Sequence, residues 1–222
     1  MNIMVDIETL GTNEDSVILQ IGAVAFDGYD EKEPDPFEGW FLTDLSVSDQ
    51  IRVYNRTVDN ETLIWWMDSV GPDARTSVLQ RDSYNGLVCS TYNALEDFNT
   101  FISMHIDSAF ETDNFIWSNS PSFDLAIIKH AMRQCDIKPV WSHWEERDVR
   151  TMHHLNKTLK LGFYKNIDGV AHNALDDAKG QAIYVMQIQE ALKEMKGSWV
   201  KHDSKPYTIN NTFKSSSIEP GF

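Results

Sequence analysis

The chain has 222 residues, of which 41% are hydrophobic, and its formal net charge at pH 7 is −15. The length suits one domain with a full hydrophobic core. The charge argues against a non-specific DNA coat or a transcription factor, because affinity for the nucleic-acid backbone comes largely from Lys and Arg. No apolar stretch reaches the roughly 18 residues of a membrane span and no secretory signal is visible, so we expect a cytoplasmic protein without a membrane partner.

The beginning of the chain predicts an antiparallel meander of three strands. Apolar and β-branched residues mark strands over Asn2–Asp6, Val17–Phe26 and Phe37–Leu42, and we expect the second strand to pair antiparallel with the first. The Gly, Pro and acidic residues of Asp27–Pro36 are typical of a hairpin loop.

Helices then alternate with two further strands. Helical spacing of apolar residues and capping residues predict helices over Glu61–Ser69, Pro72–Gln80, Thr91–His105, Asp124–Cys135, Asp148–Lys157 and Ala174–Met195. We expect a short strand at Phe115–Trp117 and a strand or loop around Val140–Trp144. This order predicts an α/β fold with a mixed five-stranded sheet flanked by helices. The domain is expected over residues 1–196, with a tail over residues 197–222 that is loosely ordered or packed on the body.

Two carboxylates, Asp6 and Glu8, stand one residue apart at the end of the first strand. Side chains of a strand alternate between its faces, so both carboxylates project from the same face. Side by side they repel each other unless a proton or cation lies between them. Mg²⁺ meets that need, because it is bound through a few carboxylates together with substrate phosphates. Such pairs are also common at solvated strand ends, so a metal site requires partners from elsewhere in the chain.

Two later segments contain candidate partners. Asp124 begins a predicted helix, where an Asp also commonly stabilises the free N–H groups of the first turn. Asn173 is a good N-cap for the last helix, and Asp176 can return the capping interaction. His172 is then expected on a loop just before that helix, and Asp177 inside its first turns. His172 is either a proton acceptor beside a carboxylate or an ordinary surface histidine.

Together these segments resemble the three motifs of the DEDDh 3′→5′ exonucleases, the DnaQ-like branch of the RNase H-like fold. The resemblance rests on D-I-E-T-L at 6–10, S-F-D at 122–124 and H-N-A-L-D-D-A at 172–178. The His stands five residues before the last Asp, as in the His subclass, and Asn173 occupies the position where the Tyr subclass has Tyr. One departure is Ser120, where many DnaQ-like proteins have Asn.

A narrower resemblance is to the phage exonuclease A group. The segments T-L-I-W-W at 62–66, G-P-D-A-R at 71–75 and W-E-E-R-D-V-R-T at 144–151 are similar to segments of that group. The resemblance covers about residues 1–195. For a phage-encoded protein, the expected location is the host cytoplasm.

The resemblance implies hydrolysis with two metal ions. Four carboxylates would hold two Mg²⁺ or Mn²⁺ ions, namely those of Asp6, Glu8, Asp124 and Asp177. His172 would take the proton from the attacking water, and the products would be nucleoside 5′-monophosphates.

The resemblance also implies contacts with the substrate. The backbone around Thr9 would bind the terminal 3′-OH, Leu10 would act as a wedge against the last base, and Phe123 of the second motif would contact the substrate. Arg75, Arg147 and Arg150 are candidate phosphate contacts, with surface ion pairing as the alternative for each. Of Trp65 and Trp66 we expect at least one in the core, and one could stack on a base.

The expected substrate is the 3′ end of single-stranded DNA, which the phage-like segments favour. An exoribonuclease acting on short RNA is an alternative, because contact with a 2′-OH leaves no readable motif. A non-catalytic RNase H-like module that binds nucleic acid or protein is a second alternative. Such a module would be expected to have lost a site residue, whereas all five are present. The sequence leaves homodimerisation open.

Overall fold

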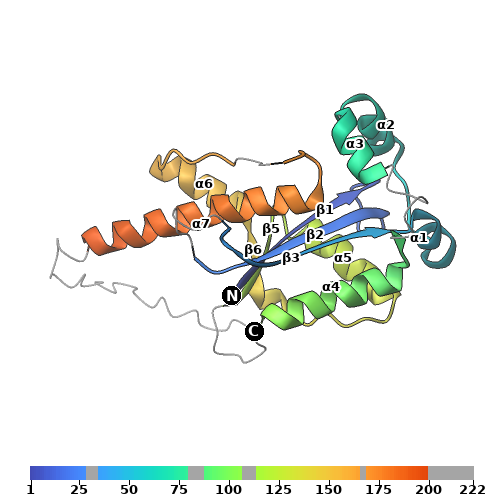
Figure 1. The fold of residues 1–222 in the computed structure, drawn as a ribbon, viewed down its shortest axis with the longest axis horizontal. Coiled ribbons are helices and arrows are strands. Elements are labelled where there is room, and N and C mark those ends of the chain that lie inside the picture. Colours follow the sequence, from blue (N-terminus) through green and yellow to red (C-terminus); the bar gives the residue numbers. More distant parts are fainter. Residues whose placement is uncertain (29–34, 80–87, 107–113, 166–168, 200–222) are drawn as a thin grey trace, which may run out of the picture.

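The computed structural model describes residues 1–28, 35–79, 88–106, 114–165 and 169–199 (Figure 1). Its strands are β1 (Asn2–Thr9), β2 (Ile18–Phe26), β3 (Phe37–Leu45), β4 (Val88–Cys89), β5 (Phe115–Ser118) and β6 (Glu146–Asp148). They form one sheet in the order β4-β3-β2-β1-β5-β6. The first three strands pair antiparallel as predicted, whereas β4, β5 and β6 each pair parallel with a neighbour.

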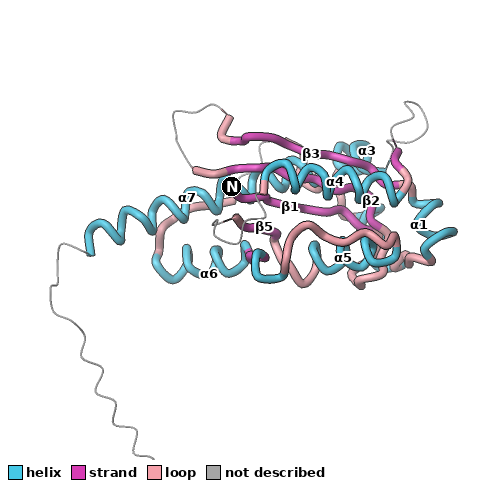
Figure 2. The backbone as a smooth tube through the Cα atoms, turned by 90° about the horizontal axis from the view of Figure 1, so that it is seen from below, coloured by secondary structure: helices cyan, strands magenta, loops and turns pink. Residues whose placement is uncertain are grey.

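The central strand β1 is buried along its whole length. It lies between β2, paired antiparallel, and β5, paired parallel, and Figure 2 shows it running between β3 and β5. Its apolar side chains contribute to the cores on both faces of the sheet. A strand enclosed in this way is among the most rigid elements of a fold, and its carboxyl end is the point from which the carboxylates project.

Helices cover both faces of the sheet. They are α1 (Val47–Tyr54), α2 (Asn60–Asp68), α3 (Pro72–Leu79), α4 (Thr91–His105), α5 (Asp124–Gln134), α6 (Val149–Leu159) and α7 (Ala174–Trp199). One core lies between the sheet and α7, with α6 beside it, and the other between the sheet and the pair α4 and α5 (Figure 1). Helices α2 and α3 stand beside the carboxyl end of β1 (Figure 1). Within the described residues, no helix is both long and apolar enough to cross a membrane.

The sheet has six strands, so the prediction of five was wrong. Strand β4 has two residues, too few for a periodic signal, and it was not predicted. The last strand lies at Glu146–Asp148, after a 3₁₀ turn at His143–Glu145, rather than around Val140–Trp144. Helix α1 was also missed: Val47, Ile51 and Tyr54 recur at helical spacing, but its eight residues are too few for that period to be read with assurance.

The predicted helices agree with the structure to within two residues at each end, except at the end of α7. Helix α7 continues to Trp199, so the predicted boundary after residue 196 falls inside it. Residues 200–222 of the predicted tail, and 29–34 of the predicted hairpin loop, lie outside the described residues.

One buried guanidinium joins the turn after β1 to α5. Arg56 donates from Nε to Ser16 O over 3.0 Å and from Nη2 to Glu14 O over 3.2 Å. Its Nη1 donates to Gln134 Oε1 over 2.9 Å and lies 3.2 Å from His130 Nδ1. All these partners are uncharged groups rather than carboxylates. Burial lowers the pKa of Arg56 to about 10, which is still well above neutral pH, so the guanidinium remains positively charged.

Candidate active site

Strand β1 places Asp6 and Glu8 on the face of the sheet that α7 covers. Their side chains alternate with those of Val5 and Ile7, which pack into the opposite core, so both carboxylates project toward α7. Both are buried, with 9% of Asp6 and 7% of Glu8 exposed. The predicted common face of the D-x-E pair is therefore confirmed.

These two carboxylates hold protons more tightly than usual. Burial raises the pKa of Asp6 well above its ordinary value, and the negative charges of Asp124, Glu8 and Asp177 raise it further. Burial, followed by the charges of Asp177 and Asp124, raises the pKa of Glu8 to about 8, and the Lys165 charge opposes this only in part. The group is thus an accumulation of buried carboxylates, whose negative charge the cations Lys165 and Arg150 offset only in part.

Asp124 joins them from the first residue of α5. Its carboxylate does not cap the helix: Oδ2 accepts a hydrogen bond from the backbone N–H of Ser120, upstream in the turn, over 3.1 Å. Burial raises the pKa of Asp124 to about 6, and the Ser120 hydrogen bond opposes the rise. Ser120, the residue that departs from the family pattern, therefore binds Asp124 through its main chain. The hydroxyl of Ser120 lies 2.9 Å from the hydroxyl of Ser122.

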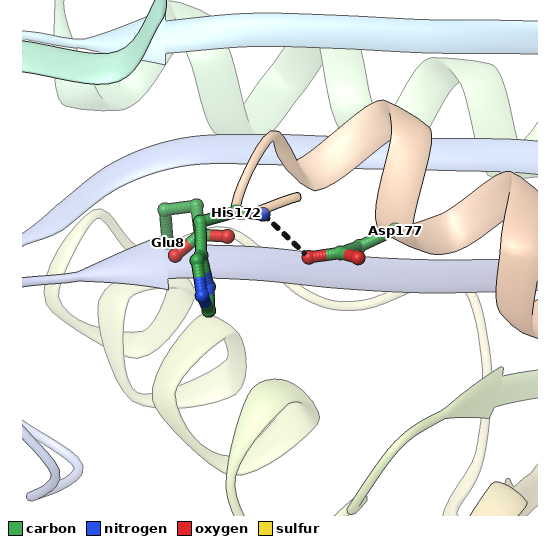
Figure 3. A group of neighbouring side chains, drawn as sticks. All are labelled: Glu8, His172 and Asp177. Carbon is green, nitrogen blue, oxygen red and sulfur yellow. Dashed lines mark hydrogen bonds between the residues drawn. The ribbon is translucent and has the colours of Figure 1, made fainter. Parts of the chain in front are cut away.

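His172 and Asp177 come together at the beginning of α7. Asn173 caps the helix, because its Oδ1 accepts from the N–H groups two and three residues further on, over 3.2 and 3.3 Å. His172 stands just outside the helix in the left-handed conformation, with φ 63°. Its backbone N–H donates to Asp177 Oδ2 over 3.1 Å, and its imidazole extends away from that bond (Figure 3). The predicted loop position of His172 is confirmed.

Asp176 has a different structural role from the predicted one. Its carboxylate accepts from the backbone N–H of Val170 over 2.9 Å, not from the N-cap residue. The same carboxylate also packs against the backbone of Gly169, where φ is 143°. A Cβ at position 169 would overlap the Asp176 carboxylate, so a larger residue would not fit without rearrangement. Asp176 therefore closes the loop that carries His172, which leaves Asp177 as the carboxylate that faces the site.

The start of α7 is fixed on β2 opposite Glu8. Gln20, the residue paired with Glu8 across the two strands, accepts from the backbone N–H of Ala174 over 2.9 Å. A Cβ at Gly22 would overlap the backbone of Ala174, so only Gly allows this approach. The strand-to-helix contact sets the position of both His172 and Asp177 relative to β1.

The structure thus brings all five predicted residues to one site. One ligand atom each from Glu8, His172 and Asp177 lie within 4.8 Å of one another, and Asp6 and Asp124 interact electrostatically with this group (Figure 3). Among the described residues, the buried oxygens Asp177 Oδ1 and Gln181 Oε1 have no hydrogen-bond partner, and the buried hydroxyl of Ser118 interacts with Asp124. Each belongs to this site or to a residue beside its carboxylates. Unpaired oxygens amid surplus negative charge fit a hydrated divalent cation such as Mg²⁺ or Mn²⁺.

A cavity of about 420 Å³ opens beside Glu8. Two of the predicted substrate contacts, Thr9 and Phe123, line it, together with Trp65. Trp65 is 40% exposed, and the centroid of its ring lies 5.0 Å from that of His172 in an edge-on arrangement. Trp66 is fully buried and donates from Nε1 to Thr9 O over 2.8 Å. As expected, at least one of the two Trp residues belongs to the core. Both border the cavity, and Trp65 is the one with an exposed surface.

Leu10 lies elsewhere. Its side chain is buried with Val17 and Leu19 in the apolar cluster beneath α2 and α3, and it lines a separate cavity rather than the one beside Glu8. This arrangement does not support the predicted wedge against the last base.

The arginines differ in their surroundings. The guanidinium of Arg147 lies 3.7 Å from the centroid of the Phe115 ring, and Nη1 donates to the backbone oxygens of Trp144 and Glu146. The guanidinium of Arg75 donates to a backbone oxygen of α2. Arg150 is exposed, and its charge acts on Asp124. Of the three, Arg150 is the one whose charge reaches the site.

Sequence reasoning missed Gln181, whose Nε2 donates to Asp6 Oδ1 over 2.7 Å. A signal was available, because Gln181 follows Asp177 by four residues and therefore lies on the same face of α7.

Comparison with known proteins places this geometry in context. A family model described as "3′-5′ exoribonuclease Rv2179c-like domain" matches residues 1–189. An exodeoxyribonuclease of Enterobacteria phage T4 is 22% identical over 164 residues, which make up 67% of this chain and 68% of the phage protein.

Two solved structures share the fold. Cell-death related nuclease 4 (CRN-4) has a TM-score of 0.51 and 16% identity, and the match covers 87% of this chain but 64% of that one. The nuclease domain of 3′hExo, a DEDDh family member solved with rAMP bound, has a TM-score of 0.51 and 12% identity, over 85% of this chain and 92% of that one. The likeness extends across most of the described α/β body.

Proposed function

The chain belongs to a family of 3′-5′ exonucleases, that of the Rv2179c-like domain, and we propose that it hydrolyses single-stranded DNA from the 3′ end with the help of two divalent metal ions. The observation that carries the proposal is the convergence of four buried carboxylates and a histidine from β1, α5 and the start of α7. The products would be nucleoside 5′-monophosphates.

The carboxylates of Asp6, Glu8, Asp124 and Asp177 would hold the ions. When bound, Mg²⁺ or Mn²⁺ would lower the pKa of a water molecule and neutralise the charge that develops on the phosphate. The raised pKa values of Asp6, Glu8 and Asp124 support this assignment, because they reflect negative charge that a cation would stabilise.

His172 would act as the general base. Its backbone N–H donates to Asp177, and its ring packs edge-on against the ring of Trp65, so the imidazole is held beside the carboxylates. A neutral imidazole there can accept the proton of the attacking water and pass it to solvent. Trp65, Phe123 and the backbone around Thr9 would then enclose the terminal nucleotide in the 420 Å³ cavity. Arg150 would contact a phosphate.

DNA is the proposed substrate because the phage T4 relative is an exodeoxyribonuclease. An exoribonuclease acting on short RNA is the second candidate, and the description of the matching family model favours it.

The test follows products from paired single-stranded DNA and RNA oligonucleotides, each labelled at the 5′ or the 3′ end, with Mg²⁺, Mn²⁺ or EDTA. Three proteins are compared: wild type, His172→Asn, and His154→Ala, which removes an exposed histidine from α6. Asn tolerates the left-handed backbone of position 172, so the variant removes the base without straining the loop.

We expect metal-dependent release of 5′-mononucleotides from the 3′ end by wild type and His154→Ala, and a large loss in His172→Asn. The ratio of DNA to RNA rates identifies the substrate. No turnover of either polymer by a folded protein that binds Mn²⁺ would contradict an exonuclease function and favour a non-catalytic binding module.

A further inference from the structure

Gln181 is a buried amide on α7 that the proposed reaction does not employ. It is 1% exposed and lies one helical turn after Asp177. Its Nε2 donates to Oδ1 of Asp6 over 2.7 Å, a short hydrogen bond between two buried side chains that are 175 residues apart in sequence. One oxygen of Asp6 is therefore bonded to α7.

The hydrogen bond to Asp6 fixes how this amide is oriented. The NH₂ group of Gln181 faces Asp6, so the amide oxygen faces away from it. That oxygen, Oε1, is buried and has no partner within the described residues. A buried acceptor without a donor destabilises a fold, and an apolar side chain of similar size would avoid the penalty. Folding alone therefore does not account for Gln at this position.

A water molecule in the site would supply the missing donor. Asp177 Oδ1 is a second buried oxygen without a partner, on the preceding turn of the same helix. Divalent ions such as Mg²⁺ keep several waters when bound through one or two carboxylates. Residues that hold such ligands and waters from behind commonly tune metal affinity.

We propose that Gln181 is a positioning residue for the metal site: its amide N–H fixes the carboxylate of Asp6, and its oxygen accepts a hydrogen bond from a water of the bound cation. The inference rests on the proposed function, because it takes Asp6 as a metal ligand. Gln181 itself touches neither the metal nor the substrate.

The test measures Mn²⁺ binding through thermal unfolding of the full chain, from a metal-free baseline in EDTA to increasing Mn²⁺. Gln181→Met replaces the amide by an apolar chain of similar length, and Gln181→Leu is a second replacement should the first not fold. The control is Tyr184→Phe on the same helix, which removes a buried hydroxyl that is bonded to His153 and Asn156, away from the carboxylates.

We expect Gln181→Met to keep or exceed the wild-type melting temperature without metal, yet to require about 10- to 100-fold more Mn²⁺ for the same rise. The Mn²⁺ concentration for half-maximal hydrolysis should increase by the same factor. Tyr184→Phe should show the opposite pattern, with a lower metal-free melting temperature and an unchanged Mn²⁺ requirement.

An unchanged Mn²⁺ requirement in Gln181→Met would overturn the inference, whether or not the metal-free melting temperature falls. If wild type itself neither responds to Mn²⁺ nor hydrolyses the oligonucleotides, the proposed function fails first and the inference fails with it. If wild type responds to Mn²⁺ and hydrolyses the oligonucleotides, but Gln181→Met has the same Mn²⁺ requirement as wild type, the proposed function stands and only the role of Gln181 is removed.

Discussion

The two halves of the site are built differently. The carboxylate floor, formed by Asp6, Glu8, Asp124 and Asp177, is buried and rises from β1, α5 and α7, which pack into the two cores. The aromatic rim, formed by Trp65, Phe123 and His172, is only partly buried and stands on a short helix, a turn and a loop. The floor is fixed by the fold, so changes there should abolish chemistry, whereas changes in the rim should alter rates or binding by degrees.

The largest effect is expected in the floor. Asp6→Asn keeps the shape but removes one charge, and we expect kcat/KM to fall by about 10⁴-fold or more, as for members of a catalytic unit. The same change should raise the melting temperature in EDTA, because it relieves repulsion among buried carboxylates. Steady-state kinetics and thermal unfolding measure the two effects. Asp73→Asn, at an exposed position of α3, is the control and should change neither.

The next largest effect is expected where the rim meets the floor. His172→Asn should lower kcat by about 10²- to 10⁴-fold, the usual contribution of a general base, without changing the rise in melting temperature with Mn²⁺. Single-turnover kinetics with excess enzyme isolates the chemical step. A rise in KM with an unchanged kcat would make His172 a binding residue of the rim and contradict its role as base.

The floor alone should make metal-free stability depend on pH. The pKa of Glu8 is about 8 in the folded protein against an ordinary 4.5, so the folded state keeps a proton that the unfolded chain releases. Stability is therefore full below pH 4.5 and falls as pH rises to about 8, by at most about 1.4 kcal/mol per pH unit for one carboxyl. Urea unfolding in EDTA between pH 5 and 8 measures the fall, and Glu8→Gln should reduce it. A free energy of unfolding that rises between pH 5 and 8 would contradict the raised pKa of Glu8.

The smallest effect is expected at the exposed part of the rim. Trp65→Ala should raise KM for oligonucleotides by about 5- to 150-fold, which corresponds to about 1–3 kcal/mol of stacking on one base, with little change in kcat. Trp65→Phe should recover part of the loss. Trp40→Ala removes a more exposed Trp, from β3, and is the control. Equal KM values for Trp65→Ala and Trp40→Ala would remove Trp65 from the substrate site.

The floor could be predicted from the sequence because each of its parts has a local signal. The alternation of a strand puts Asp6 and Glu8 on one face, and the Asn173 cap begins a helix at the residue that leaves His172 outside and Asp177 inside. The resemblance to known motifs then joined these signals across the chain.

What the sequence did not predict depends on contacts between distant segments. Leu10 follows the motif closely, but its side chain is buried by the packing of α2 and α3. Arg147 is held by the ring of Phe115 on the neighbouring strand. Strand β4 and helix α1 are too short for a reliable periodic pattern. Gln50, which anchors α1 by bonding to Ile18 of β2, is polar and gives no core signal.

The buried guanidinium of Arg56 gives the molecule a frame that is insensitive to acidity. It ties the turn after β1 to α5 through main-chain carbonyls, an amide and the ring of His130, and it keeps its charge below its own pKa of about 10. Burial, followed by the charge of Arg56, lowers the pKa of His130, so the ring stays neutral to lower pH than a free histidine. The carboxyl groups of Asp124 and Glu8, with pKa values of about 6 and 8, gain and lose protons near neutral pH, whereas Arg56 keeps its charge there. We therefore expect the spacing of β1 and α5 to change little when the carboxylates of the site take up protons.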